Sequence, residues 1–565
     1  MARAASLAIV LAALIGCATP QGSGSTPPLG AARGPAEPAA RVRIIAAMSG
    51  DPPVLYQKLN TNNATRGIVA AEQLVDVGLT IHDDAQVLHP RLAEAVPSIE
   101  NGLWRVFPDG RMETTWHIRP NARWHDGEPF TAGDLVFTAT VGRDQELGAF
   151  GLIAYRSLDT VEATDPRTVT VRWSKPYIQA DWMFSNAIAL PLPRHLLERA
   201  YMEDKTNLMT HPYWNQQFVG TGPFKLQDWV VGSHLLLRAN DDYVLGRPKI
   251  DEIEVRFILD SNAIMANVLA GAVDVTLDRT LSTEQAIQVR SSWDGEVMIG
   301  APDSAMNLWP QLLTPNPSVI GNVQFRRALF YAIDRQQMVD VLMAGLSSVT
   351  DSWVGRYEPE YATIEPKIVK YRYDPRLATQ MIEGLGYTMA SDGLFRDATG
   401  QNLSVELRTI SLDVNQKALF STADFWKRAG VDAQPVVIPT ERQSDQEYRS
   451  TFPGFDLNRG AARVTQLDWL HSSNARLPEN NFRPQGSGIN YARYTNPDLD
   501  QLIERLFTTI PRAQRMDLAG DIARVMTDQA LVVTLFYDAV PVLSSRRLRG
   551  VAHGLPFNAE EWSVQ

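Results

Sequence analysis

The sequence predicts an α/β fold divided into two or three lobes. The chain has 565 residues, and a single hydrophobic core stops growing at about 250–300 residues, so longer chains divide. In the second half, amphipathic helices alternate with apolar strand-like runs, which is typical of a lobe with a largely parallel sheet. Hydrophobic residues make up 44% of the chain and aromatic residues 8%. This composition is ordinary for a globular protein and excludes disorder over most of the length.

In the first half, several stretches read as strands and others as helices. Residues 41–48 (RVRIIAAM) form a buried strand before the turn residues SGDPP, and a helix follows around residues 68–77. In TTWHIR, Trp116 and Ile118 fall on one face of a half-buried strand. Two further strands flank a turn at Gly232. IDEIEVRFIL then alternates as a strand, and SNAIMANVLAGAVDV reads as a helix that ends at Gly271 and is followed by a short strand.

The stretch WHDGEPF places a histidine, an aspartate and a glutamate within residues 124–130, which raises the possibility of a catalytic or metal site. Asp126-Gly127 is a dipeptide favoured in tight turns. Thr131 and Asp134 have the spacing of a capping box that starts a helix. A metal site needs ligands that converge, and the preceding histidine is one strand away. We therefore interpret the stretch as scaffold.

The second half contains four helices with recognisable starts and two strands between them. Asn322 and Asp334 precede helices as caps, and prolines follow Asp374 and Asn496 at first helical positions. Apolar residues recur at helical spacing in the helix that follows Asn322: Phe325, Ala328, Leu329, Ala332 and Ile333. VELRTI (405–410) and QPVVIP (434–439) read as strands.

Charge and motifs exclude several function classes. The 53 basic and 64 acidic residues give a net charge of −11, the wrong sign for gripping a nucleic acid backbone. Gly220-Thr-Gly222 lacks the ending of a phosphate-binding loop. A hydrolase of the cell envelope is one functional hypothesis. Against it, the histidines form no HExxH motif, and the only GxSxG-like fragment lies near the N-terminus. No catalytic residue, cofactor or metal site is predicted.

The N-terminus indicates export. The apolar run over residues 4–15 is shorter than the roughly 20 residues that span a bilayer and suits a secretory signal. Cys17 is the only cysteine, so no intramolecular disulfide can form; a small buried hydrophobe is one interpretation of it. Residues 18–40 contain five prolines and four glycines, a composition typical of a flexible tether.

Several stretches, in this order, resemble the bacterial family 5 extracellular solute-binding proteins, the peptide, nickel and opine receptors of ABC importers. LIGC at Cys17 resembles the lipobox of bacterial lipoproteins, in which the cysteine is lipidated. The other matching passages are HPRLAEAVP (89–97), WHIRPNARWHDGEPFTAGDLVF (116–137), GTGPFKL (220–226) with NDDYVLGRPKIDEIEVRF (240–257), LAGAVDV (269–275), FRRALFYAIDR (325–335), YDPRLATQMIEGLGY (373–387) and NYARYTNPDLDQLI (490–503).

The resemblance implies a two-lobed, periplasmic-binding-protein-like fold that closes about a hinge, with an extra domain inserted in the first lobe. We expect a signal peptide over residues 1–17 and a linker over 18–40. Lobe I is expected over 41–85, 215–300 and 540–565, the inserted subdomain over 86–214, and lobe II over 301–539.

The resemblance also implies a function without chemistry. We expect a monomeric, lipid-anchored receptor in the periplasm or cell envelope that binds a small solute, most plausibly an oligopeptide, and delivers it to an ABC permease. A peptide sensor or chaperone without transport is an alternative, and so is an opine receptor. A nickel-chelate receptor is a further alternative, because His471 beside Trp469 leaves room for a chelate-bound metal.

Seven residues are candidates for contact with the ligand. Peptide-binding members carry a Gly-Trp…Asp-Tyr stretch whose aspartate pairs with the peptide α-amino group; here Asp468 precedes Trp469, and a solvated loop acid is the alternative. The other five candidates come from position, with core packing or an exposed arginine as their alternative roles: Met48 and Ser49 after the first strand, Trp309 near the presumed hinge, Trp353, and Arg463 for a ligand carboxylate.

Overall fold

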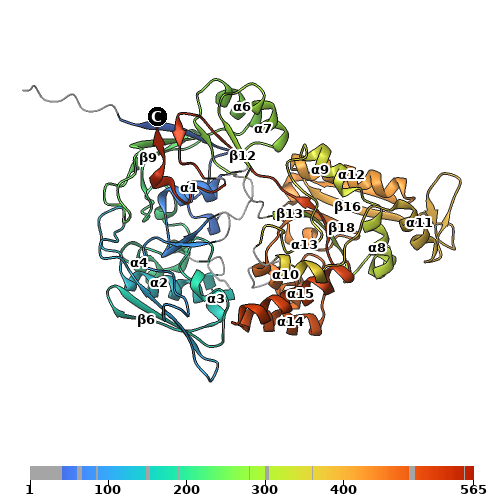
Figure 1. The fold of residues 1–565 in the computed structure, drawn as a ribbon, viewed down its shortest axis with the longest axis horizontal. Coiled ribbons are helices and arrows are strands. Elements are labelled where there is room, and N and C mark those ends of the chain that lie inside the picture. Colours follow the sequence, from blue (N-terminus) through green and yellow to red (C-terminus); the bar gives the residue numbers. More distant parts are fainter. Residues whose placement is uncertain are drawn as a thin grey trace, which may run out of the picture. The chain divides into compact units, whose positions relative to one another are not determined.

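The computed structural model describes most of the chain after residue 40: residues 41–59, 67–83, 87–144, 146–147, 153–188, 190–278, 280–299, 304–358, 361–443, 445–482, 490–552 and 554–565. The predicted signal peptide with Cys17 and the predicted linker over 18–40 lie outside these residues. Val42–Gln565 forms one compact unit, and its sheets and helices are those of an α/β fold (Figure 1).

A seven-stranded sheet joins both ends of this unit. β1 (Arg43–Met48) lies inside it, parallel to β10 (Glu252–Phe257) and β11 (Val275–Thr276). The other strands pair antiparallel, and the full order is β12 (Glu296–Ile299), β20 (Pro541–Ser544), β11, β1, β10, β9 (His234–Ala239) and β8 (Phe224–Val230). The predicted first strand and the hairpin that turns at Gly232 are confirmed. Helices α1 (Ile68–Val75), α6 (Ser261–Leu269) and α7 (Thr283–Arg290) accompany this sheet.

A separate antiparallel sheet of four strands lies within residues 104–173. Its order is β4 (Trp104–Val106), β5 (Met112–His117), β7 (Thr168–Trp173) and β6 (Leu158–Asp165). Along β5 every second residue is buried, and Trp116 and Ile118 are buried on the same side as predicted. α2 (Ala132–Arg143) begins with the predicted capping box between Thr131 and Asp134, and α4 (Arg194–Glu203) packs against α2.

The third large sheet has five strands, in the order β17 (Asp432–Ile438), β16 (Ser404–Ile410), β18 (Phe455–Ala461), β13 (Ser304–Pro310) and β19 (Val533–Tyr537). β16 is parallel to β17 and β18, but β13 is antiparallel to β18 and β19. The prediction of a largely parallel sheet is therefore wrong for half of the pairings. Parallel neighbours need a crossover such as α12 (Asp413–Arg428), whereas β13 and β19 enter from segments that connect two sheets.

Helices cover this five-stranded sheet and begin where the sequence predicts. α12 packs on β16 and β17, and α14 (Pro497–Thr508) lies beside α15 (Arg512–Asp528) (Figure 1). Side chains of the predicted caps accept hydrogen bonds from first-turn N–H groups. The capped helices are α8 (Val323–Tyr331, capped by Asn322), α9 (Arg335–Leu342, by Asp334), α11 (Pro375–Glu383, by Asp374) and α14 (by Asn496).

The chain passes between the seven-stranded and five-stranded sheets twice, from β12 to β13 and from β19 to β20. The two passages touch, because the N–H of Asp538 donates to the carbonyl of Ser304 at 3.0 Å. The seven-stranded and five-stranded sheets are therefore joined by two adjacent connections.

The WHDGEPF stretch has a structural role through His125. The N–H of Gly220 donates to its Nδ1 at 3.2 Å, and its Nε2 bonds to the carbonyl of Gly222 at 3.0 Å. Burial lowers the pKa of His125 to about 4, so the ring is neutral at pH 7, with Nδ1 accepting and Nε2 donating. The histidine therefore ties the hairpin to the start of β8.

This neutral histidine predicts a pH effect on stability. Below pH 6.5 the unfolded chain protonates His125 but the folded chain does not until about pH 4, so stability falls as the pH falls through this interval. A glutamine can accept and donate in the same positions and does not titrate. Between pH 6.5 and pH 4, the free energy of unfolding of His125→Gln should therefore fall by about 1–3 kcal/mol less than that of the wild type, measured by urea unfolding. Equal losses in both proteins would refute this role.

Candidate functional site

A row of four aromatic rings lies against β13. Trp309, on β13, contacts Trp353 edge to face with ring centroids 5.0 Å apart, and contacts Tyr491 at 5.4 Å. Trp353 contacts Trp469 edge to face at 5.5 Å. Trp309 and Trp353 are fully buried, and Trp469 is partly exposed. The two buried rings therefore pack in the core, which is the alternative role that the sequence allows for them.

The local backbone explains how two tryptophans fit beside the sheet. On β18, Gly460 lies opposite Ala305 of β13. A Cβ atom on Gly460 would lie 2.8 Å from Nδ2 of Asn307 and 3.4 Å from Nε1 of Trp353. The absence of a side chain at this position lets the indole of Trp353 approach the strand.

Two carboxylates and a tyrosine lie at one end of the row. Asp468, in the 3-10 helix Val464–Leu470 that also carries Trp469, is buried. Burial, and then the charges of Asp468 and Asp181, raise the pKa of Tyr177. Burial also raises the pKa of Asp181 to about 7, against the opposing charge of Arg515. Groups from residues 177–181 and from residues 464–470 therefore meet here, almost 300 positions apart in the sequence.

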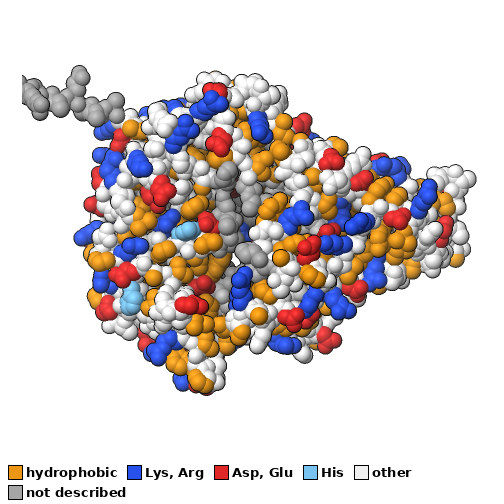
Figure 2. Space-filling model, viewed as in Figure 1, with side chains coloured by type: hydrophobic (Ala, Val, Ile, Leu, Met, Phe, Trp, Pro, Cys, Tyr) orange, Lys and Arg blue, Asp and Glu red, His pale blue; other side chains and the backbone are white. Residues whose placement is uncertain are grey.

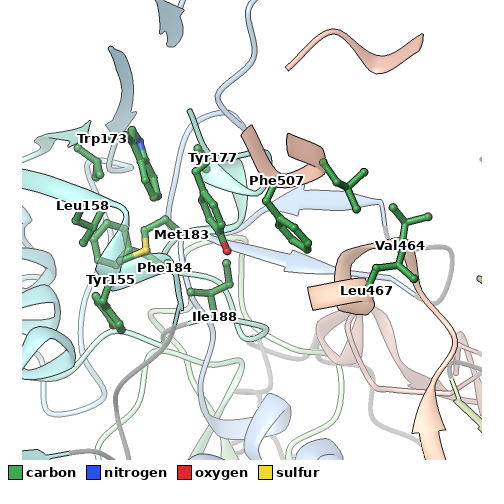
Figure 3. Close-up of a cluster of buried hydrophobic side chains, with 14 of the residues drawn as sticks. Tyr155, Leu158, Trp173, Tyr177, Met183, Phe184, Ile188, Val464, Leu467 and Phe507 are labelled. Carbon is green, nitrogen blue, oxygen red and sulfur yellow. The ribbon is translucent and has the colours of Figure 1, made fainter. Parts of the chain in front are cut away.

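Apolar side chains surround this acidic end. Tyr177 lies beside Phe507, with Val464 and Leu467 beyond it, and Met183 on its other side (Figure 3). The backbone N–H of Ile178 donates to the carbonyl of Phe507 at 3.2 Å. Charges in an apolar setting interact more strongly than in water, so a cationic group that reached Asp181 or Asp468 would be held firmly.

Buried polar atoms without a protein hydrogen-bond partner gather around the row. Native structures pair about nine in ten such groups, so a concentration of exceptions points to a ligand or water. Within the described residues, those near the row or its acidic end are Asn307 Oδ1, Trp309 Nε1, Trp353 Nε1, Asp456 Oδ1, Gln466 Oε1 and Asp181 Oδ1. The arrangement combines aromatic faces, hydrogen-bonding groups and anionic charge, which suits a polar ligand of moderate size.

The structure brings four of the seven candidate residues together: Trp309, Trp353, Asp468 and Trp469. Met48 does not join them. It ends β1, is fully buried, and packs in the core of the seven-stranded sheet, with Ser49 next to it. Arg463 is half-buried and precedes the 3-10 helix of Asp468. Contact of any of the seven residues with a ligand stays a prediction.

Sequence reasoning missed Tyr177, Asp181, Asp456 and Tyr491. One of them carried a local signal: in FDLN, Asp456 alternates with the apolar residues of a strand that is buried on both faces, and a charge inside such a strand is unusual. Tyr177 and Asp181 carry no comparable signal, because only the folding of distant segments places them near Asp468.

Among the described residues, no three histidine, cysteine or acidic side chains are grouped so as to hold a metal ion. His471 lies 3.9 Å from Asp500 and 3.6 Å from Glu504. In the same part of the chain, each helix is too short or too polar to cross a bilayer. Basic and acidic side chains are interspersed on the face shown in Figure 2.

Comparison with known proteins gives a consistent result. The model of the bacterial extracellular solute-binding proteins, family 5 (middle), matches residues 88–473. The oligopeptide-binding protein AppA of Bacillus subtilis is 23% identical over 536 residues, which are 92% of this chain and 91% of that protein.

Two solved structures share the fold. One is B. subtilis AppA in complex with a nonapeptide: the TM-score is 0.74 at 20% identity, covering 93% of this chain and 99% of that one. The other is NikZ of Campylobacter jejuni in complex with Ni(L-His): the TM-score is 0.73 at 21% identity, covering 92% and 99%. The two-lobed α/β architecture expected from the sequence is thus confirmed.

The acidic end of the row predicts an effect on stability. Because the pKa of Asp181 is raised to about 7, the folded chain binds a proton there that the unfolded chain has already released above pH 4. Stability therefore falls as the pH rises toward 7. Asp181→Asn should raise the free energy of unfolding of the unliganded chain at pH 8 by about 1–2 kcal/mol, measured by urea denaturation.

Asp424→Asn is the matched control, because Asp424 is exposed on α12 and pairs with Arg428 four residues on; its effect should stay within about 0.5 kcal/mol. A loss of stability in Asp181→Asn would mean that this carboxylate is a structural partner of Arg515.

Proposed function

Because this chain belongs to family 5 of the bacterial extracellular solute-binding proteins, we propose that it is a lipid-anchored receptor of an ABC importer that binds an oligopeptide between two lobes. The observation that carries the peptide assignment is the site itself, where Asp468 lies at the end of a row of aromatic rings. The B. subtilis relative is an oligopeptide-binding protein by name, which supports the same class of ligand.

Each part of the site matches a feature of a peptide. Asp468 supplies a carboxylate for the α-amino group, and Asp181, from another segment, adds a second carboxyl group whose ionisation a bound cation favours. The partly exposed face of Trp469 accepts side chains or the peptide backbone without demanding one sequence. The hydrogen-bonding atoms of Gln466 and Asn307 that lack protein partners are available to peptide amides.

Binding is proposed to close a hinge. The two passages between the large sheets, from β12 to β13 and from β19 to β20, are the connections about which such a hinge would turn. Asp181 precedes the first passage and Asp468 lies between the two. A ligand that contacts both groups binds the closed arrangement better than an open one and shifts the population toward it.

The proposals of a lipid anchor and of a permease partner rest on the N-terminal sequence and on the family. Lipidation of Cys17 would hold the protein at the cell envelope, and the tether over residues 18–40 would let the folded body reach a permease. Delivery of the solute to that permease completes the proposed role.

Mass spectrometry of the full purified chain tests the ligand class directly. Spectra under native and denaturing conditions should differ by a heterogeneous set of masses that fragment as peptides. One discrete non-peptide mass, such as a metal chelate, would reject the peptide assignment and leave a receptor for another solute.

Asp468→Asn should weaken peptide binding by about 10- to 100-fold, because a hydrogen bond to a charged group contributes roughly 1.5–3 kcal/mol. Affinity is measured by calorimetry with peptides identified in the released set. N-acetylated forms of these peptides should bind the wild type and the variant almost equally, since they lack the charged amine. Asp424→Asn is the control and should bind like the wild type. Equal affinity of Asp468→Asn and wild type for the free-amine peptides would remove Asp468 from the site.

A further inference from the structure

Three buried arginines gather at the other end of the aromatic row. Arg408 is on β16, Arg449 on the short helix α13 (Gln446–Ser450), and Arg476 follows the 3-10 helix Ser472–Asn474. Their exposed fractions are 3%, 9% and 8%. Asp456 on β18 lies opposite Arg408 in the strand register and is fully buried among them.

Each of these arginines has one buried donor, its Nε, that its contacts with the described residues leave unused. Arg408 donates to the carbonyl of Tyr448, and its guanidinium lies 4.8 Å from the centre of that ring. Arg449 lies 3.6 Å from Asp456, and the guanidinium of Arg476 lies 5.1 Å from the centre of Tyr491. The Nε atoms of all three arginines, and Oδ1 of Asp456, are buried without a hydrogen-bond partner among the residues that the structure describes.

Positive charge is in excess in this cluster. Arginine does not lose its proton in proteins, so the three guanidiniums carry three charges against the one of Asp456. Glu406, two residues before Arg408 on the same face of β16, is half-buried; burial raises its pKa and Arg408 opposes that shift. Even with Glu406 ionised, the described residues of the cluster leave one positive charge uncompensated. A buried charge without a counter-charge is strongly unfavourable.

The cluster is continuous with the candidate site. Tyr491, beneath Arg476, also contacts Trp309, and Asp456 is the strand partner of Trp309. Asp468 and Asp181 lie at the far end of the same row. The row therefore runs from an anionic end to a cationic end.

We propose that Arg408, Arg449 and Arg476 form an oxyanion site that holds a carboxylate or phosphate group of the bound solute. This inference rests on the proposed function and narrows it: the transported ligand carries a negative group at the end opposite the one that Asp468 binds. Planar guanidinium groups match such oxyanions with paired N–H donors.

The experiment compares alanine peptides of increasing length, each as the free acid and as the C-terminal amide, by calorimetry on the full chain. The wild type should bind the free acid about 10- to 100-fold more tightly than the amide. Arg476→Gln should bind both forms with equal affinity. Arg476→Lys keeps the charge but not the planar fork and should retain part of the preference. Thermal unfolding of each variant shows whether it is folded.

Arg442→Gln is the matched control, since Arg442 lies over the same Tyr448 ring at 3.8 Å but is exposed and pairs with Asp445; it should keep the full preference. Equal affinity of the wild type for acid and amide peptides would overturn the inference and leave the peptide receptor intact. So would a folded Arg476→Gln that keeps the wild-type preference.

A second set of measurements distinguishes the failure of this inference from the failure of the proposed function. If no peptide binds in either form, the peptide assignment fails, and thermal shifts with inorganic phosphate, sulfate and citrate test the cluster alone. Stabilisation of the wild type by one of these anions that Arg476→Gln lacks would assign the cluster to an oxyanion-bearing solute that is not a peptide. No stabilisation by any of them would overturn the oxyanion site.

Discussion

The pairing of β13 with β18 is the constraint on which the candidate site depends. Because side chains alternate between the faces of a strand, this register sends Met306, Leu308, Phe455 and Leu457 into one core. It sends Asn307, Trp309, Asp456 and Asn458 to the opposite face. A shift of the register by one residue would exchange the two sets and bury the polar groups in the hydrophobic core. The site is therefore specified by the same hydrogen bonds that hold the sheet.

The polar groups on this face of β13 and β18 reduce the stability of the unliganded chain. Asp456 is fully buried, the three arginines near it are almost so, and several of their polar atoms have no protein partner. Packing alone would favour apolar residues at these positions, since replacing buried ion pairs with well-packed hydrophobic side chains is often neutral or stabilising. Groups that reduce the stability of the unliganded chain and strengthen the hold on a ligand are typical of a binding site.

The sequence was sufficient for features that depend on near neighbours. Asn322, Asp334, Asp374 and Asn496 cap helices because a cap is a contact within one turn. Likewise, WHDGEPF could be assigned to scaffold from its turn and capping residues. The order of strands in the five-stranded sheet could not be predicted in this way, because β13 and β19 come from distant segments. The proximity of Tyr177 and Asp181 to Asp468 could not be predicted for the same reason, because these segments are distant in the sequence. Only the family resemblance pointed to Asp468.

The separation of charge along the aromatic row limits what the site can hold well. A solute with one charged group would compensate only one end, and the buried charge at the other end would remain without a counter-charge. A zwitterion of the right length compensates both ends at once, and apolar or aromatic groups between its charges can pack on the ring of Trp469. Specificity then arises mainly from the distance between the two charges rather than from side-chain identity. This is how a receptor can accept many sequences and still reject solutes of the wrong length or charge.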